Sequence, residues 1–380
     1  MKYNIKRDWR SLAVLLIISA NHFMQRPLRD TLAVAVGAEN LNWLMAGTLT
    51  GTVLLSFIII GIERRVDIRK LVPYLLIVVG IGQLMLYYRL NDINFINALL
   101  YFSFNGATSL TILTLTWRRI TTAQGFTDDK RLNAYTATNL GAIAGPLLTL
   151  IITQLFGELT LLPFSTTLLI LCAVYLISLD RRCEEVARFS SSLPRLPVKR
   201  LIAFMVLYTF VATGFYYFTL KTVGTHLPQG DRNKLFTFLD LITNCSVLVL
   251  PHLLRRWSRQ PIAFLIVPCI SLLLLSSLGI RFTIVTAVVA LVVFKVSNLS
   301  VQRPAREWLY LQSRFSTPYS TQNFLDAVIY RLGDVTAAWM ITLMLNNDAG
   351  FTQVLSVFVM AASLWIITGY SISKNINLTN

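Results

Sequence analysis

Apolar runs long enough to cross a lipid bilayer recur from one end of the chain to the other. A helix of roughly 20 apolar residues spans a hydrocarbon core of about 30 Å. These runs predict twelve transmembrane helices, at residues 10–36, 41–62, 71–89, 94–117, 131–156, 159–179, 200–224, 234–254, 261–279, 282–303, 322–346 and 350–373. We therefore expect an all-α polytopic membrane protein.

The longest polar connection divides these runs into two sets of six. Residues 180–199 contain two prolines and a run of three serines, which are typical of a linker. This predicts an N-terminal six-helix bundle at 1–179, a cytoplasmic linker at 180–199 and a C-terminal six-helix bundle at 200–380.

Basic residues are distributed unevenly between the polar connections. With the N-terminus inside, 25 of the 34 Lys and Arg residues fall in segments on the inner side. Positive charge is retained on the cytoplasmic side of membrane proteins. We therefore expect a multi-pass protein of a bacterial inner membrane with both termini in the cytoplasm.

Composition supports this assignment and excludes several other classes. Hydrophobic residues make up 55% of the chain and charged residues 14%. The net charge of +16 would suit a nucleic-acid-binding protein, but its loop distribution indicates membrane orientation instead. The four cysteines have no metal-ligand spacing, so neither a metal nor a cofactor is expected.

The predicted fifth helix contains the segment GAIAGP at 141–146. Its glycines are four residues apart and allow close helix packing, and Pro146 permits a bend. The segment resembles the glycine-rich helix-5 signature of the major facilitator superfamily. That superfamily's usual signature after helix 2 is hardly visible in GIERRVDIRK, at 61–70.

Charged residues within the first helix are the first candidates for a binding site. Arg26 and Arg29 lie about one turn apart, His22 lies a turn earlier, and Asp30 is placed to pair with Arg26. A charge at the centre of a membrane helix costs about 2.5–3.5 kcal/mol, so such residues need partners or water. The alternative is that these side chains extend to the interface near residue 37.

The tenth helix carries a polar stripe on an otherwise apolar surface. Lys295, Asn298, Gln302 and Arg306 recur at three- and four-residue spacing and share one face. We expect this face to line water or substrate. For the inner end of this stripe, Arg303 and Arg306 with Glu307, anchoring at the inner side of the membrane is the alternative, and for Arg303 it is at least as well supported as a ligand role.

The eleventh helix aligns Asp326, Tyr330 and Asp334 at four-residue spacing, with Arg331 beside them. These charges could form ion pairs that open and close during transport, or the carboxylates could carry protons. A static network that only fixes helix packing is equally compatible with the pattern.

Two further helices contribute polar positions. Asp240 on the eighth helix is a candidate coupling or gating residue. Tyr217 on the seventh is a candidate substrate contact, because its ring could stack on a planar ligand. Packing or interfacial anchoring is the commoner role of such aromatic residues in membrane proteins.

Three of these segments together resemble a known family. RPLRD (26–30), RPAREWLY (303–310) and NFLDAVIYRLGD (323–334) are similar to motifs of the ATP/ADP translocases, which are nucleotide transport proteins and a distant branch of the major facilitator superfamily. The matching positions are Arg26, Arg29, Asp30, Arg306, Glu307, Asp326, Arg331, Gly333 and Asp334. The resemblance implies a major-facilitator-like fold and exchange or uptake of nucleotides or other phosphorylated anions.

These observations predict a monomeric secondary active transporter for a small organic anion. The candidate cargos are a nucleotide, a phosphorylated metabolite and a carboxylate-rich molecule such as a siderophore. Exchange against a second anion (antiport) and coupling to protons both remain open. An embedded enzyme is less favoured, because the three histidines lie on separate elements and no phosphate-binding loop is present. A channel or scaffold is less favoured because the layout of two six-helix sets is typical of transporters.

Overall fold

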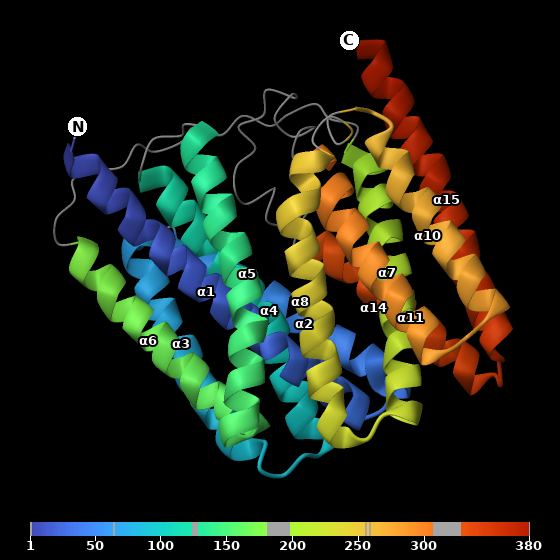
Figure 1. Ribbon diagram of the computed structural model, residues 1–380, viewed down its shortest axis with the longest axis horizontal. Coiled ribbons are helices and arrows are strands. Elements are labelled where there is room, and N and C mark those ends of the chain that lie inside the picture. Colours follow the sequence, from blue (N-terminus) through green and yellow to red (C-terminus); the bar gives the residue numbers. More distant parts are fainter. Residues whose placement is uncertain are drawn as a thin grey trace. The chain divides into compact units, whose positions relative to one another are not determined.

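The computed structural model describes residues 2–63, 65–123, 128–180, 198–254, 257, 260–306 and 328–379. Each of the twelve predicted spans overlaps a helix in this part of the chain, and the start of the span predicted at 322–346 lies outside the described residues. The long helices are α1 (Lys2–Ala35), α2 (Leu41–Glu63), α3 (Ile68–Arg89), α4 (Phe95–Ala123), α5 (Asp128–Phe156), α6 (Leu161–Asp180), α7 (Val198–His226), α8 (Gln229–Leu253), α10 (Ala263–Ile280), α11 (Ile284–Ser297), α14 (Tyr330–Asn346) and α15 (Phe351–Thr379). The fold is all-α and polytopic, as predicted (Figure 1).

Three short segments complete the described helices. η1 (Ala38–Asn40) and η2 (Glu158–Thr160) are 3₁₀ turns, each entered through a glycine with positive φ, Gly37 at 94° and Gly157 at 93°. Glycine adopts this conformation without steric penalty, so both chain reversals are local consequences of sequence. η3 (Asn298–Gln302) is a π-helix that continues α11.

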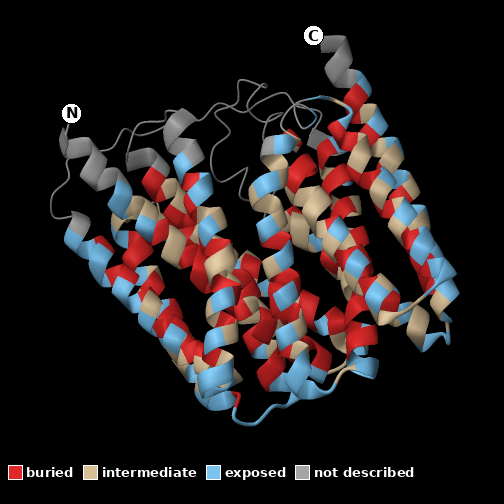
Figure 2. Ribbon diagram, in the orientation of Figure 1, coloured by how far each residue is buried: buried red, intermediate tan, exposed pale blue. Residues whose placement is uncertain are grey.

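Ten helices in the described residues are long and apolar enough to cross a membrane. α1 and α14 are not among them, because α1 carries three charges in its second half and α14 is described over 17 residues. Burial differs among the spans, from 67% of the apolar window in α7 to 22% in that of α2. Figure 2 shows exposed positions along α6 and α15, where apolar side chains such as Leu171 and Ile367 are available to lipid.

The described chain forms two compact units. Unit 1 comprises Met1–Val36, Thr50–Arg188 and Gln229–Asn244, and unit 2 comprises Gly37–Leu49, Phe189–Pro228 and Cys245–Asn380. The start of α2 therefore belongs to unit 2 and the first part of α8 to unit 1. Bundles at 1–179 and 200–380 remain a prediction, and most of the 180–199 linker lies outside the described residues.

Unit 1 is organised around α1, which lies against α5 (Figure 1). A Cβ atom at Gly145 would lie 2.5 Å from the carbonyl oxygen of Ala20, so only glycine permits this approach. The hydroxyl of Thr149 then donates to the Met24 carbonyl at 2.9 Å. This confirms the close helix packing predicted from GAIAGP.

Unit 2 is organised around α7, which α11, α14 and α15 contact. Its interior is aromatic, with ring pairs at centroid distances that favour edge-to-face or offset contacts. The buried rings are those of Phe204, Tyr208, Phe215, Phe218, Phe264, Phe294, Phe358 and Trp365. The ring of Tyr208 stacks on that of Phe294, with 5.7 Å between centroids.

Candidate functional site

The charged residues of α1 form two ion pairs within unit 1. Arg29 donates from Nη2 and Nε to Oδ1 of Asp30, at 2.7 and 3.0 Å, and its guanidinium lies 5.1 Å from the ring centre of Phe102. Arg26 contacts Asp240 of α8, with 3.7 Å between Nε and Oδ2. We call these four residues the arginine cluster.

The structure gives Asp30 a different partner from the one that helical spacing offered. The sequence allowed a pair with Arg26, which lies four residues earlier, but the structure pairs Asp30 with the adjacent Arg29. The reason is that the long arginine side chain can reach a neighbouring carboxylate, while Asp240 approaches Arg26 from α8. The two carboxylate side chains are each 3% exposed, so both ion pairs are largely shielded from solvent.

One further polar contact holds the first part of α8 in unit 1. The side-chain amide of Asn244 donates to the Ala142 carbonyl of α5 at 2.7 Å. A proline has no N–H, so Pro146 leaves the carbonyl four residues earlier without its helical donor. That carbonyl belongs to Ala142, and α8 supplies the missing hydrogen bond.

A second polar cluster lies within unit 2, where α7, η3 and α14 meet. Oη of Tyr208 lies 3.0 Å from Oη of Tyr330 and accepts a hydrogen bond from the amide of Asn298 at 2.8 Å. Asp334 accepts from Thr213 at 2.9 Å and from Arg331 at 3.3 Å. We call these six residues the tyrosine cluster.

The remaining predicted residues of unit 2 are placed as follows. Arg306 interacts electrostatically with Tyr208 and Tyr330, and Gln302 is 1% exposed. Lys295 lies on α11, one residue after the Phe294 ring, and is half-buried. Tyr217 lies nine residues beyond Tyr208 on α7 and within electrostatic range of Glu39 of η1.

Glu307 and Asp326 lie outside the described residues. The described part of the chain therefore brings together Arg26, Arg29, Asp30 and Asp240 in one cluster, and Asn298, Arg331 and Asp334 in the other.

Sequence reasoning missed a set of uncharged polar residues beside the arginine cluster. Nε2 of Gln25 donates to Ser165 at 2.6 Å, and its Oε1 accepts from Asn105 at 2.7 Å and from Gln83 at 3.3 Å. Oη of Tyr101 lies 3.5 Å from the same oxygen. This set, which we call the glutamine hub, joins α1, α3, α4 and α6. Our search followed charge, but neutral amides in apolar helices would have pointed to it.

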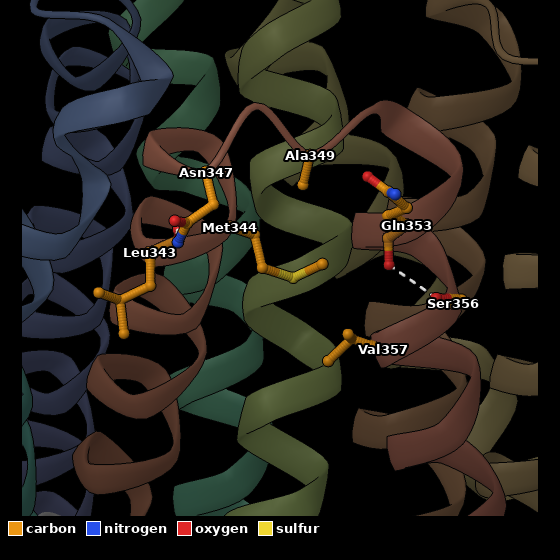
Figure 3. Close-up of a pocket in the computed structure, with 7 residues that line it drawn as sticks. All are labelled: Leu343, Met344, Asn347, Ala349, Gln353, Ser356 and Val357. Carbon is orange, nitrogen blue, oxygen red and sulfur yellow. Dashed lines mark hydrogen bonds between the residues drawn. The ribbon is translucent and has the colours of Figure 1, made fainter.

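A surface hollow lies elsewhere, at the turn between α14 and α15. Its lining, drawn in Figure 3, consists of Leu343, Met344, Asn347, Ala349, Gln353, Ser356 and Val357. The hydroxyl of Ser356 donates to the Gln353 carbonyl at 2.7 Å. This lining holds no charged side chain, so the hollow is a poor candidate for an anion site.

In the part of the chain that the structure describes, no group of three or more His, Cys, Asp or Glu side chains could hold a metal ion. The side chains of both clusters offer ion pairing and hydrogen bonding. Guanidinium groups of this kind can bind carboxylates and phosphates through paired hydrogen bonds.

Comparison with solved structures identifies the class of fold. The chain is similar to an auto-inhibited peptide transporter of the POT family, with a TM-score of 0.64, 10% sequence identity and coverage of 98% of this chain and 97% of that one. It is also similar to a D-xylose–proton symporter, with a TM-score of 0.65, 12% identity and 97% coverage of both chains. At such low identity these similarities show the fold alone, and that fold is major-facilitator-like.

Sequence comparison does not assign the chain to a family. No protein-family model matches the chain, and no curated protein matches it. The residues of the two clusters therefore carry the functional argument.

Proposed function

We propose that this protein is a secondary active transporter that moves a small organic anion across the membrane by alternating access. The observation that carries the proposal is the arginine cluster, in which two arginines of α1 are kept at partly buried positions by carboxylate partners. Guanidinium groups are costly inside a membrane and mark substrate or ion pathways. The major-facilitator-like fold supports the proposal, since transporters of that type use such residues near the midplane.

The contact between Arg26 and Asp240 suggests how an anion would promote movement. At 3.7 Å the pair is longer than an optimal charge-assisted hydrogen bond. An incoming phosphate or carboxylate would compete with Asp240 for Arg26. Because a ligand shifts a conformational equilibrium only through its differential affinity for the two states, the anion would favour the state in which Asp240 has left Arg26. Release of Asp240 would loosen the attachment of α8 to α1.

The proposed cargo is a nucleotide or another phosphorylated metabolite, with a carboxylate-rich anion as the alternative. The similarity of RPLRD, RPAREWLY and the segment ending at Asp334 to the ATP/ADP translocases supports the nucleotide. The D-xylose symporter of similar fold is a proton symporter by name, so proton coupling is the alternative to anion exchange. In the tyrosine cluster, Asp334 is the described carboxylate best placed to carry a proton.

Uptake into vesicles tests the proposal. Purified protein reconstituted into vesicles would be offered radiolabelled ADP, glucose 6-phosphate and citrate in turn. We expect at least one of them to accumulate. Arg26→Gln should lower its uptake at least tenfold, whereas Asp240→Asn should lower both KM and the maximal rate, because the competitor for Arg26 is weakened and the gate closes poorly.

The matched control is Lys234→Gln. Like Arg26, Lys234 is an ion-paired cation. It lies on α8, with 3.1 Å between its Nζ and Oδ1 of Asp231, but its side chain is 65% exposed. It should transport like the wild type. Wild-type uptake by both cluster variants would remove Arg26 and Asp240 from the mechanism, and failure of all three anions to accumulate would contradict the proposed function.

Coupling is tested in the same vesicles. If Asp334 carries a proton, an ionophore that collapses the pH gradient should abolish net accumulation, and Asp334→Asn should retain exchange of labelled for unlabelled anion while losing accumulation. Accumulation that is unchanged by the ionophore would favour anion exchange instead.

A further inference from the structure

Gln302 occupies an unusual position at the end of the π-helix η3. Its side chain is 1% exposed, yet neither its amide nitrogen nor its amide oxygen has a hydrogen-bond partner among the described residues. A buried polar group without a partner costs about 1–3 kcal/mol. An apolar side chain of the same length would avoid that cost.

The backbone around Gln302 is also irregular. η3 spans Asn298–Gln302 and interrupts the α-helical hydrogen-bonding pattern between α11 and the helical residues 303–306. Single π-turns inside α-helices occur frequently at functional sites, because the widened turn redirects side chains. Irregular backbone and an unsatisfied amide therefore coincide at one position.

The neighbours of Gln302 define what could reach it. Asn298 and Arg306 lie four residues before and after it and flank it along the helix. Asn298 donates to Tyr208, and Arg306 interacts electrostatically with Tyr208 and Tyr330. Gln302 thus lies on the helix between one residue that contacts the tyrosine pair by hydrogen bonding and another that does so by charge.

We propose that Gln302 recognises an uncharged donor–acceptor group on the transported anion, and that this group is a carboxamide. A primary amide side chain presents one acceptor and two donors in one plane, which matches the C=O and N–H of another amide. Arg306, one helical turn away, would add positive charge beside that amide. The cargo is then an anion that carries an amide, a narrower class than phosphorylated or carboxylated solutes in general. This inference rests on the proposed function and defines its substrate.

The first experiment needs no ligand. Gln302→Met keeps the length of the side chain and removes its polar atoms, so it should raise the unfolding midpoint of the purified protein by a few degrees. The matched control is the same change at Gln25, whose amide is hydrogen-bonded, and there the midpoint should fall. A lower midpoint for Gln302→Met would show that the amide is satisfied in the resting protein, and would overturn the proposal.

The second experiment compares anions that differ only in an amide. Two pairs are suitable: N-acetylglucosamine 6-phosphate with glucose 6-phosphate, and N-acetylglutamate with glutarate. Binding to wild-type protein and to Gln302→Met would be measured by thermal shift, because a ligand that binds only the folded form raises its unfolding midpoint. We expect the amide-bearing member of at least one pair to bind wild type at least tenfold more tightly than its partner. Gln302→Met should lose this preference without losing affinity for the amide-free anion.

The outcomes separate this inference from the function on which it rests. Equal binding within both pairs, no binding by either amide-bearing member, or a preference that persists in Gln302→Met would each reject the amide assignment. If Gln302 binds only a water molecule, any preference for the amide-bearing anion would persist in Gln302→Met. If an amide-free anion still accumulates in vesicles and Arg26→Gln lowers that uptake at least tenfold, anion transport stands while the amide assignment falls.

Discussion

Two glutamines are buried to the same extent in this protein and are used in opposite ways. Gln25 in unit 1 and Gln302 in unit 2 are each 1% exposed. Both polar ends of the Gln25 amide are hydrogen-bonded, with three partners within 3.3 Å, whereas the Gln302 amide has none in the described chain. A buried amide is therefore not in itself a sign of function. Its hydrogen-bond partners distinguish a structural group from one that is available to a ligand.

The surroundings of the two residues follow the same contrast. The glutamine hub links four helices of unit 1 through amides and hydroxyls, and it lies beside the arginine cluster, because Tyr101 is within electrostatic range of Arg29 and Asp30. The interior of unit 2 is aromatic around Tyr208, and aromatic contacts fix geometry less strictly than a saturated hydrogen-bond network does. We infer that the hub fixes α1, while the region around η3 adapts to what it binds.

Removing the hub should have the largest effect on stability. Gln25→Leu removes one hydrogen bond each from Asn105, Gln83 and Ser165. Ser165 still donates to Gln83 and Asn105 still has Tyr101, but the amide nitrogen of Gln83 loses its bond to Gln25. At about 1 kcal/mol for each of the three hydrogen bonds lost, the total loss should exceed about 2 kcal/mol. Thermal unfolding of the purified protein would report a midpoint lower by several degrees. A midpoint equal to that of the wild type would remove the distinction between the two glutamines.

Disrupting the close packing of α1 on α5 should have the second-largest effect on stability. A methyl group at Gly145 would meet the backbone oxygen of Ala20 at 2.5 Å and the backbone nitrogen of Met24 at 2.9 Å, and neither atom can move without shifting α1. Gly145→Ala should therefore cost about 1–3 kcal/mol, as overpacking does elsewhere. Gly61→Ala is the control, because nothing lies within 4 Å of its added methyl. Equal unfolding midpoints for the two variants would show that α1 can shift at little cost.

The smallest effect is expected in unit 2. Tyr208→Phe keeps the ring in the aromatic core and removes the hydroxyl that contacts Asn298 and Tyr330. The net loss should be about 1 kcal/mol, since an adaptable region can offer those groups new partners. Tyr370→Phe, at a tyrosine that is 59% exposed, should leave the midpoint unchanged. A loss for Tyr208→Phe as large as that for Gln25→Leu would show that unit 2 is as strictly held as unit 1.

Hydropathy predicted the helices well because every helix that crosses a lipid bilayer needs a run of roughly 20 apolar residues. The predicted 41–62 became Leu41–Glu63, and 350–373 became the apolar part of Phe351–Thr379. The largest error at a described helix end is at the start of α1, which begins at Lys2 instead of residue 10. A helix can continue beyond its apolar residues, so apolar content reports the length of the apolar run and not where the helix begins or ends.

The candidate site was only partly predictable. Charge in an apolar context identified Arg26, Arg29, Asp240 and Asp334, because a charge in a membrane helix requires compensation. The pairing of Arg26 with Asp240 depends on how α8 approaches α1, and no spacing along one helix contains that information. The π-helix could not be predicted either, because the polar stripe from Lys295 to Arg306 is compatible with an ordinary α-helix.

The hydrogen bond from Asn244 to the Ala142 carbonyl has a consequence for reversibility. Because Pro146 withholds its donor permanently, that oxygen takes no part in the internal hydrogen-bond ladder of α5. If α8 separates from α5 during the proposed transport cycle, Asn244 would leave without breaking any hydrogen bond within α5, and a water molecule would be able to replace it. Pro146 thus gives α5 a docking point for α8 whose release leaves the hydrogen bonds of α5 itself intact.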